Sequence, residues 1–303
     1  MQAVRPEYKP GQFLTLRIPS EQTGSVARCY SLASSPFTDP QPKVTVKRTA
    51  DGYGSNWVCD NLSPGTQVEV LPPSGVFTPK SYDTPLLLIA AGSGVTPVMS
   101  ILKAALEKGD APIVFFYANR DVADVIFAAE LRDLLAAHPN RLTLVHWLES
   151  LQGLPSAAAL ATAFAPYATS HVAYMCGPGP FMDAVHKGLS DANFPHHNVH
   201  TEVYNSLSGD PFADVVLDER FERDPGPDTE LDPLREGLSR LLDGVDEDAA
   251  EVGILLERGD EAVRPEGEHA GADPQESAVL ADALPHQPRA PDLGDGGLGR
   301  PAS

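Results

Sequence analysis

LLLIAAGSGVTP, residues 86–97, decides the fold of this 303-residue chain. Six apolar residues in a row, with no polar position, are typical of a strand that is buried on both faces of a parallel sheet. Gly92 and Gly94 follow at once, and Thr96 lies at the start of a helical pattern. Glycines let the backbone approach a pyrophosphate, and free N–H groups at a helix start favour an anion. Because any tight strand-to-helix turn also favours glycine, this segment leaves a purely steric interpretation open.

The same arrangement recurs at the end of a later apolar run, where Cys176 is followed by Gly177, Pro178 and Gly179. Carboxyl ends of parallel strands share one edge of a sheet, so the two turns together predict a dinucleotide site better than either turn alone. Cys176 is either a small buried hydrophobe or a functional thiol at a strand tip, and the residues around it leave both open.

From Pro85 onward, apolar strands alternate with helical stretches. This alternation predicts a doubly wound parallel sheet, a nucleotide-binding α/β domain over residues 81–213. The expected strands are 86–91, 113–118, 142–147, 172–176 and 199–204, and the expected helices include 97–108, 127–138 and 180–189.

The preceding region reads differently, because short strands are separated there by turn residues. This pattern predicts a small antiparallel barrel over residues 1–80. Its expected elements are strands at 12–18, 27–33, 43–48 and 67–71 and a short helix at 55–62.

One strand of this barrel carries Arg28 and Tyr30 on one face and Ser31 on the other. The guanidinium can neutralise a diphosphate, the phenol ring can stack on a flat heterocycle, and the hydroxyl can reach a ring nitrogen. Taken alone, an exposed arginine and a core tyrosine would be the simpler interpretation. The stretch Gly52–Asn56 supplies a second glycine-rich turn that opens a helix, which favours a pyrophosphate in this domain as well.

Composition excludes several other functions. The net charge of −20 argues against binding nucleic acid, which needs clustered Lys and Arg. Three widely separated cysteines argue against a disulfide framework or a zinc site. The sequence shows no signal peptide and no run of about 18 apolar residues, so we expect a cytoplasmic chain without a membrane partner.

The last 90 residues have a composition of their own. Residues 214–303 hold 24 Asp and Glu against 8 Arg, no Lys and one aromatic residue, Phe221. Such a segment buries too little apolar area to offset chain entropy, so we expect a disordered acidic tail, with a short helix near residues 231–242.

These features make the chain resemble the ferredoxin–NADP reductase superfamily over about residues 7–213, in particular the reductase components of steroid 9α-hydroxylases and similar oxygenases. The resemblance implies a flavoenzyme that takes a hydride from NADH or NADPH to FAD and passes single electrons to an oxygenase component or a separate ferredoxin, in steroid or aromatic degradation. The matching segments are residues 10–13, 28–36, 45–48, 52–56, 92–97, 117–121, 146–150, 176–180 and 200–204.

The resemblance also implies roles for single residues. Arg28, Tyr30 and Ser31 would hold the FAD phosphate, ring and ring nitrogen. The ribityl side would be lined by Val46 and Lys47, and the pyrophosphate would be held by backbone around Gly52, Gly54 and Ser55. The nicotinamide dinucleotide would be framed by Gly92, Gly94, Thr96, Cys176, Gly177, Pro178 and Tyr204, and the hydride would pass near Ser31, Cys176 and Glu202.

The charged residues that follow the expected strand 113–118 bear on the choice between NADH and NADPH. Arg120 can accept a 2′-phosphate, but Asp121 and Asp124 lie just beyond it and would repel one. This favours NADH. Both aspartates are equally well placed to cap a helix that starts near Val125.

The sequence departs from this family twice. Relatives continue with a plant-type [2Fe–2S] domain, which needs four cysteines, but residues 214–303 have none, so we expect no cluster in this chain. Translation in a shifted frame after about Asp218 would give such a composition. The chain also opens at Tyr8–Gly11, a point that follows the first barrel strand in relatives, so we expect that strand to be missing. A catalytically impaired nucleotide-binding fragment and a cluster-free flavin reductase acting on small acceptors therefore remain alternatives.

Overall fold

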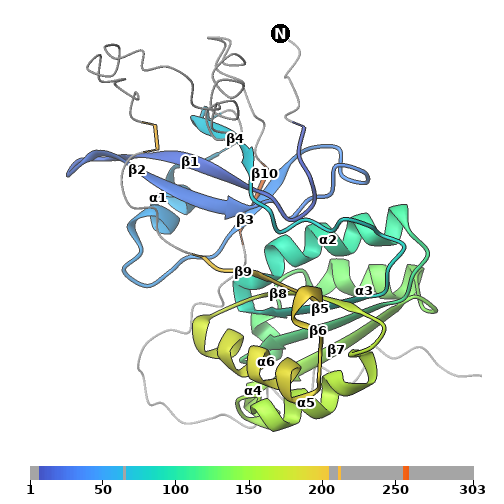
Figure 1. Ribbon diagram of the computed structural model, residues 1–303. Coiled ribbons are helices and arrows are strands. Elements are labelled where there is room, and N and C mark those ends of the chain that lie inside the picture. The colour runs from blue at the N-terminus through green and yellow to red at the C-terminus, as the bar shows by residue number, and fades with distance from the viewer. Residues whose placement is uncertain (1–6, 64–65, 205–210, 213–254, 259–303) are drawn as a thin grey trace, which may run out of the picture. The chain divides into compact units, whose positions relative to one another are not determined.

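The computed structural model describes residues 7–63, 66–204, 211–212 and 255–258 (Figure 1). Two sheets of different kinds lie in succession along the described chain, an antiparallel sheet of three strands and a parallel sheet of five.

The parallel sheet has the strand order β7-β6-β5-β8-β9. All six residues of β5 are buried because helices cover both faces of the sheet. The chain adds β6 and β7 on one side of β5 and then returns to add β8 and β9 on the other. The strands are β5 (Leu86–Ala91), β6 (Ile113–Asn119), β7 (Leu142–Leu148), β8 (Val172–Cys176) and β9 (Val199–Glu202).

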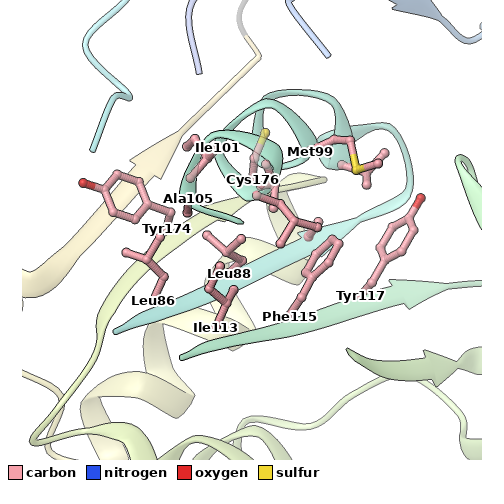
Figure 2. Packing of buried hydrophobic residues seen from close by; sticks show 14 of the residues in the cluster. Leu86, Leu88, Met99, Ile101, Ala105, Ile113, Phe115, Tyr117, Tyr174 and Cys176 are labelled. Carbon is pink, nitrogen blue, oxygen red and sulfur yellow. The ribbon is translucent and has the colours of Figure 1, made fainter. Parts of the chain in front are cut away.

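Helices α2 (Val95–Lys108) and α3 (Ala128–Ala137) cover one face of this sheet, and α5 (Ala157–Phe164) and α6 (Gly179–Asp191) cover the other (Figure 1). Alternate residues of each strand therefore enter two separate apolar cores. Figure 2 shows the core under α2, where Leu88 and Phe115 of the sheet pack beneath the helix. Short elements complete this half: η1 (Gly92–Gly94), η2 (Val122–Asp124), α4 (Glu149–Gln152), η3 (Ala165–Tyr167) and η4 (His196–Asn198).

The antiparallel sheet has β1 (Phe13–Ser20) in its centre, between β2 (Gly24–Ser31) and β4 (Val70–Ser74). Pro72 and Pro73 cannot donate to a strand ladder, and accordingly β4 is an edge strand whose register shifts opposite residues 13–15. Helix α1 (Tyr53–Asn61) closes the apolar core of this half through Val58 and Cys59.

β3 (Lys43–Val46) meets the residues that directly follow β2, through a bridge between Leu32 and Val44 and a hydrogen bond from the Ala33 N–H group to the Lys43 carbonyl at 2.7 Å. It pairs in parallel with β10 (Leu255–Arg258), the one strand described beyond residue 212. The described strands of this half therefore form two sheets and not one continuous barrel. The predicted helix near residues 231–242, and the rest of the predicted disordered tail, lie outside the described residues.

The strands and helices predicted over residues 12–204 agree with the structure to within a few residues at each end; α4, α5 and β10 were not among the predicted elements. No helix in the described ranges is both long and apolar enough to cross a bilayer. Within the same ranges, no three His, Cys, Asp or Glu side chains gather in a way that could hold a metal ion.

Candidate functional site

The carboxyl ends of β5 and β8 lie side by side, with Ala90 in register with Cys176. Here the chain changes the direction in which it adds strands, and open α/β sheets bind ligands in the crevice at such a point. The two glycine-rich turns predicted from the sequence are therefore neighbours in space.

Gly94 packs so closely against the end of β8 that no side chain fits. A β-carbon on Gly94 would lie 2.7 Å from the backbone nitrogen of Gly177 and closer still to the carbonyl oxygen of Cys176. The requirement for glycine at this position is steric, since it lets two strand ends approach each other.

Gly92 has a different role, because its φ of 51° is in the left-handed region. A β-carbon on Gly92 would meet no atom within 4 Å, so this turn presents bare backbone to open space, as close approach of a phosphate group requires. The hydroxyl of Tyr117 on β6 donates to the Gly92 carbonyl at 3.1 Å and holds the turn in place. Sequence reasoning missed Tyr117; its position two residues before the end of β6 was the available signal.

Tyr204, two residues after β9, brings both halves of the molecule together. Its hydroxyl lies 2.9 Å from the Thr96 hydroxyl and 3.3 Å from the Ser93 carbonyl oxygen, and it also interacts with the side chains of Ser31 and Cys176. The residue as a whole is 47% exposed, and its hydroxyl is held by the contacts to Thr96 and Ser93. Burial raises the pKa of Tyr204 well above its ordinary value, so the group is a neutral hydrogen-bond donor.

Cys176 is fully buried and packs with the core beneath α2 (Figure 2). Burial raises the pKa of its thiol to about 12, so the sulfur is protonated at neutral pH and is no nucleophile. Glu202 is in register with Cys176 on β9, and partial burial raises the pKa of its carboxyl. A partly buried carboxylate can accept a hydrogen bond from a ligand amide.

Arg28 of β2 meets the start of α1. A β-carbon on Gly54 would lie 2.8 Å from Arg28 Cγ and 3.2 Å from its Nε, so only glycine leaves room for the arginine stem beside the helix. Gly52 occupies the N-cap, and no side chain caps the helix there. The first N–H groups of α1 and the Arg28 guanidinium, which donates to the Ala27 carbonyl at 2.8 Å, are donors that could hold a diphosphate, and we call this group the diphosphate cradle.

The resemblance assigns four further residues to the flavin, namely Tyr30, Val46, Lys47 and Ser55. Ser55 Oγ accepts a hydrogen bond from the Thr49 backbone at 3.1 Å, which closes the turn before α1. Tyr30 packs against the apolar core of this half, and burial raises the pKa of its phenol to about 12 although Arg28 opposes the shift. Val46 is buried at the end of β3, and Lys47 beyond it is exposed.

Strand β2 connects the two clusters. Arg28 and Ser31 are three residues apart, which corresponds to about 10 Å along an extended chain. The diphosphate cradle therefore lies at one end of this short segment, and the group around the Tyr204 hydroxyl lies at the other.

Arg120 follows β6 and is exposed, and its backbone carbonyl accepts a hydrogen bond from the Ser150 N–H group at 2.8 Å. Asp121 caps η2 by accepting a hydrogen bond from the Val122 backbone at 2.6 Å. Helix α3 begins only at Ala128, so the predicted capping role holds for Asp121 at η2 and not at α3. Pro178 is the N-cap residue of α6, beside Gly177.

Two family models match the chain. One describes an oxidoreductase FAD-binding domain and matches residues 3–78, and the other describes an oxidoreductase NAD-binding domain and matches residues 88–187.

Among curated proteins, the chain is similar to the ferredoxin reductase component of 3-ketosteroid-9-alpha-monooxygenase from Rhodococcus rhodochrous. The identity is 68% over 217 residues, which cover 72% of this chain and 62% of the relative. The component of the same name from Mycolicibacterium smegmatis is 57% identical over 227 residues, 75% of this chain and 64% of the relative. The chain thus spans a little less than two thirds of the length of these relatives.

Among solved structures, the chain is similar to the cytochrome P450 reductase of Amycolatopsis. The TM-score is 0.57 and the identity 24%, over 67% of this chain and 62% of that structure. At this identity the likeness is one of fold.

Proposed function

We propose that this chain, which matches an oxidoreductase FAD-binding domain over residues 3–78 and an oxidoreductase NAD-binding domain over residues 88–187, moves a hydride from NADH to FAD and delivers electrons one at a time to an oxygenase system. The observation that carries the proposal is the meeting of Ser31, from the flavin half, with Thr96 and Cys176, from the nucleotide half, around the hydroxyl of Tyr204.

In this proposal the flavin half is residues 1–80, and the nucleotide half is residues 81–213. When bound, FAD would take two electrons and a proton from NADH as one hydride and return the electrons singly to one-electron acceptors. The protein's contribution is to place the two rings against each other and to exclude water.

Arg28 and the first turn of α1 would hold the FAD diphosphate, and the Tyr30 ring would stack on the flavin. The Ser31 hydroxyl, at the far end of β2, would donate a hydrogen bond to a ring nitrogen. The bare backbone at Gly92 would receive the nucleotide phosphates, and Glu202 would accept from the nicotinamide amide. The neutral Cys176 thiol would fill the space beneath that ring.

For the nucleotide we propose NADH over NADPH. The Asp121 carboxylate beside η2 and the partly buried Asp124 both stand near the end of β6, where they would repel a 2′-phosphate. Arg120, the one cation beside them in this loop, is exposed to solvent.

For the acceptor we propose a separate ferredoxin or the oxygenase component itself, with a steroid as the oxygenase substrate, by similarity to the two named relatives. No cysteine follows Cys176 in the sequence, so residues 177–303 cannot ligate an iron–sulfur cluster through four cysteines. Three widely separated cysteines, an odd number, do not suit the disulfide framework of an exported protein, and we propose a cytoplasmic location.

Anaerobic titration tests this function. Protein reconstituted with FAD should show flavin absorbance, and stoichiometric NADH should bleach it at a much lower concentration than NADPH does. Reoxidation by a plant-type ferredoxin should then restore the absorbance. Failure to retain FAD after reconstitution would leave only a nucleotide-binding fragment, whereas reoxidation by ferricyanide but by no ferredoxin would favour a reductase of small acceptors.

A further inference from the structure

Lys103, in the middle of α2, is buried, with 5% of its surface exposed. Its ammonium lies 3.0 Å from Asp39 Oδ2, 3.2 Å from Asp39 Oδ1 and 3.0 Å from Glu130 Oε1. A lysine is rarely buried unless it is paired, and here one ammonium serves two carboxylates.

The two carboxylates come from different halves of the molecule. Glu130 is on α3, in the same half as Lys103, and ties α2 to its neighbour on one face of the parallel sheet. Asp39 is in the loop that follows β2, only eight residues after Ser31. The Lys103–Glu130 pair would suffice to hold α2 against α3, so the Asp39 pair adds a connection between the halves.

The same loop is attached to α2 a second time. One turn before Lys103, the Ser100 hydroxyl donates to the Ser34 carbonyl at 2.5 Å. Asp39 in turn accepts from the Ser35 backbone at 2.7 Å, which keeps residues 34–39 folded. Two successive turns of α2 thus hold a loop that begins directly after Ser31.

Helix α2 starts in the turn formed by residues 92–96, which we call the nucleotide cradle. The N-cap of α2 is Gly94, and Thr96 is in its first turn. A displacement of α2 relative to residues 34–39 would therefore move Thr96 relative to Ser31. Proximity effects in catalysis are steep, and a misplacement of about 1 Å can cost about a hundredfold in rate.

We propose that Lys103, through its ion pair with Asp39, is a positioning residue that fixes the nucleotide cradle against the flavin half at the distance hydride transfer needs. This inference rests on the proposed function. Lys103, Asp39 and Glu130 would act by holding the two halves in place, without touching either ligand. Glu130 holds the lysine in place, and Asp39 transmits the alignment.

Paired substitutions separate alignment from simple stability. Asp39→Asn removes the pair between the halves and keeps an oxygen for the Ser35 N–H group, whereas Glu130→Gln removes the pair within one half. Lys187→Met is the matched control, because Lys187 forms an exposed ion pair with Asp191 at 2.9 Å on α6. For each protein we would measure the melting temperature, the flavin spectrum, the apparent Kd for NADH, and the limiting rate of flavin bleaching in rapid mixing.

The limiting rate of Asp39→Asn should fall at least about tenfold, with the Kd for NADH and the flavin spectrum within about twofold of wild type. The limiting rate of Glu130→Gln should fall less than that of Asp39→Asn, even if the two variants lose the same amount of melting temperature. Lys187→Met should match wild type in both measurements. In cofactor-free protein, hydrogen exchange at residues 34–39 should become faster in Asp39→Asn but not in Glu130→Gln.

The proposal would be overturned if the limiting rates of Asp39→Asn and Glu130→Gln simply followed their losses in melting temperature. The two ion pairs would then contribute only to stability. If Asp39→Asn fails to fold, Asp39→Glu replaces it, because it keeps the charge and changes only the length; a wild-type limiting rate there would equally overturn it. Wild-type protein that is not bleached by NADH would instead refute the proposed function, so the two failures are distinguishable.

Discussion

Gly94 and Cys176 approach each other so closely that the start of α2 and the end of β8 are in backbone contact. This contact brings the two glycine-rich turns side by side, although Gly94 and Cys176 are 82 positions apart in the sequence. It also explains why Cys176 is buried at a strand tip, a position that is otherwise open to ligands.

Substituting Gly94 by alanine should damage both stability and nucleotide oxidation. Its β-carbon would lie 2.7 Å from the Gly177 nitrogen, and backbone cannot yield as a side chain can. We expect a loss of about 1–3 kcal/mol in the free energy of unfolding, measured with urea, together with a lower rate of NADH oxidation.

Gly179→Ala is the control for this change, because a β-carbon there would meet no atom within 4 Å. It should leave stability within about 0.5 kcal/mol of wild type. If Gly94→Ala were as stable as Gly179→Ala, the close approach of the two strand ends would be wrong.

Gly54→Ala should weaken FAD binding without destabilising the cofactor-free protein. The new methyl group would push the Arg28 stem away from α1, whereas alanine in place of glycine favours a helix by about 1 kcal/mol. Loss of a charge-assisted hydrogen bond corresponds to about a tenfold or greater increase in the Kd for FAD, measured by fluorescence titration. Asn61→Ala at the other end of α1 should leave that Kd unchanged, and an equal effect of both variants would exclude the diphosphate cradle.

Tyr204→Phe should lower the KM for NADH. The Tyr204 hydroxyl is hydrogen-bonded to the Thr96 hydroxyl at 2.9 Å, at the turn where the nucleotide is proposed to bind. In this proposal the incoming nucleotide must displace the Tyr204 hydroxyl. A net hydrogen bond of about 1 kcal/mol corresponds to a change of about fivefold. Steady-state kinetics of Tyr204→Phe, Thr96→Val and the double variant would show this: additive effects of the two substitutions on KM would mean that the hydroxyls do not interact.

Glu202→Gln should raise the melting temperature at neutral pH but not at acidic pH. Partial burial raises the pKa of this carboxyl in the folded protein, so the folded state favours its protonated form. Its contribution to stability is therefore full below the unfolded pKa of about 4.3 and is lost as pH rises toward the folded value. Thermal melts between about pH 4 and pH 8 should show the difference between variant and wild type growing with pH. A difference that is constant over this range would contradict the assigned burial of the carboxylate.

Much of the fold could be predicted because its signals are local. The buried run at residues 86–91 and the glycines after it specify a parallel strand and a turn, and similar runs locate the other four strands of that sheet. The three-stranded sheet was also visible, since short alternating strands and turn residues need no distant partner to be recognised. The pairing of residues 255–258 with β3 carried no such signal, because it joins segments more than 200 residues apart.

The amino-acid sequence by itself determined which residues could carry the chemistry: the glycines of the three turns, the Arg28–Ser31 strand, and the carboxylate of Glu202. Only the tertiary structure decided which of them meet. Ser31, Thr96 and Cys176 converge on Tyr204, Arg28 packs against Gly54, and Lys103 links Asp39 to Glu130. The physical reason is that residue type and periodicity are encoded locally, whereas burial, pKa and contact depend on packing between elements distant in the chain.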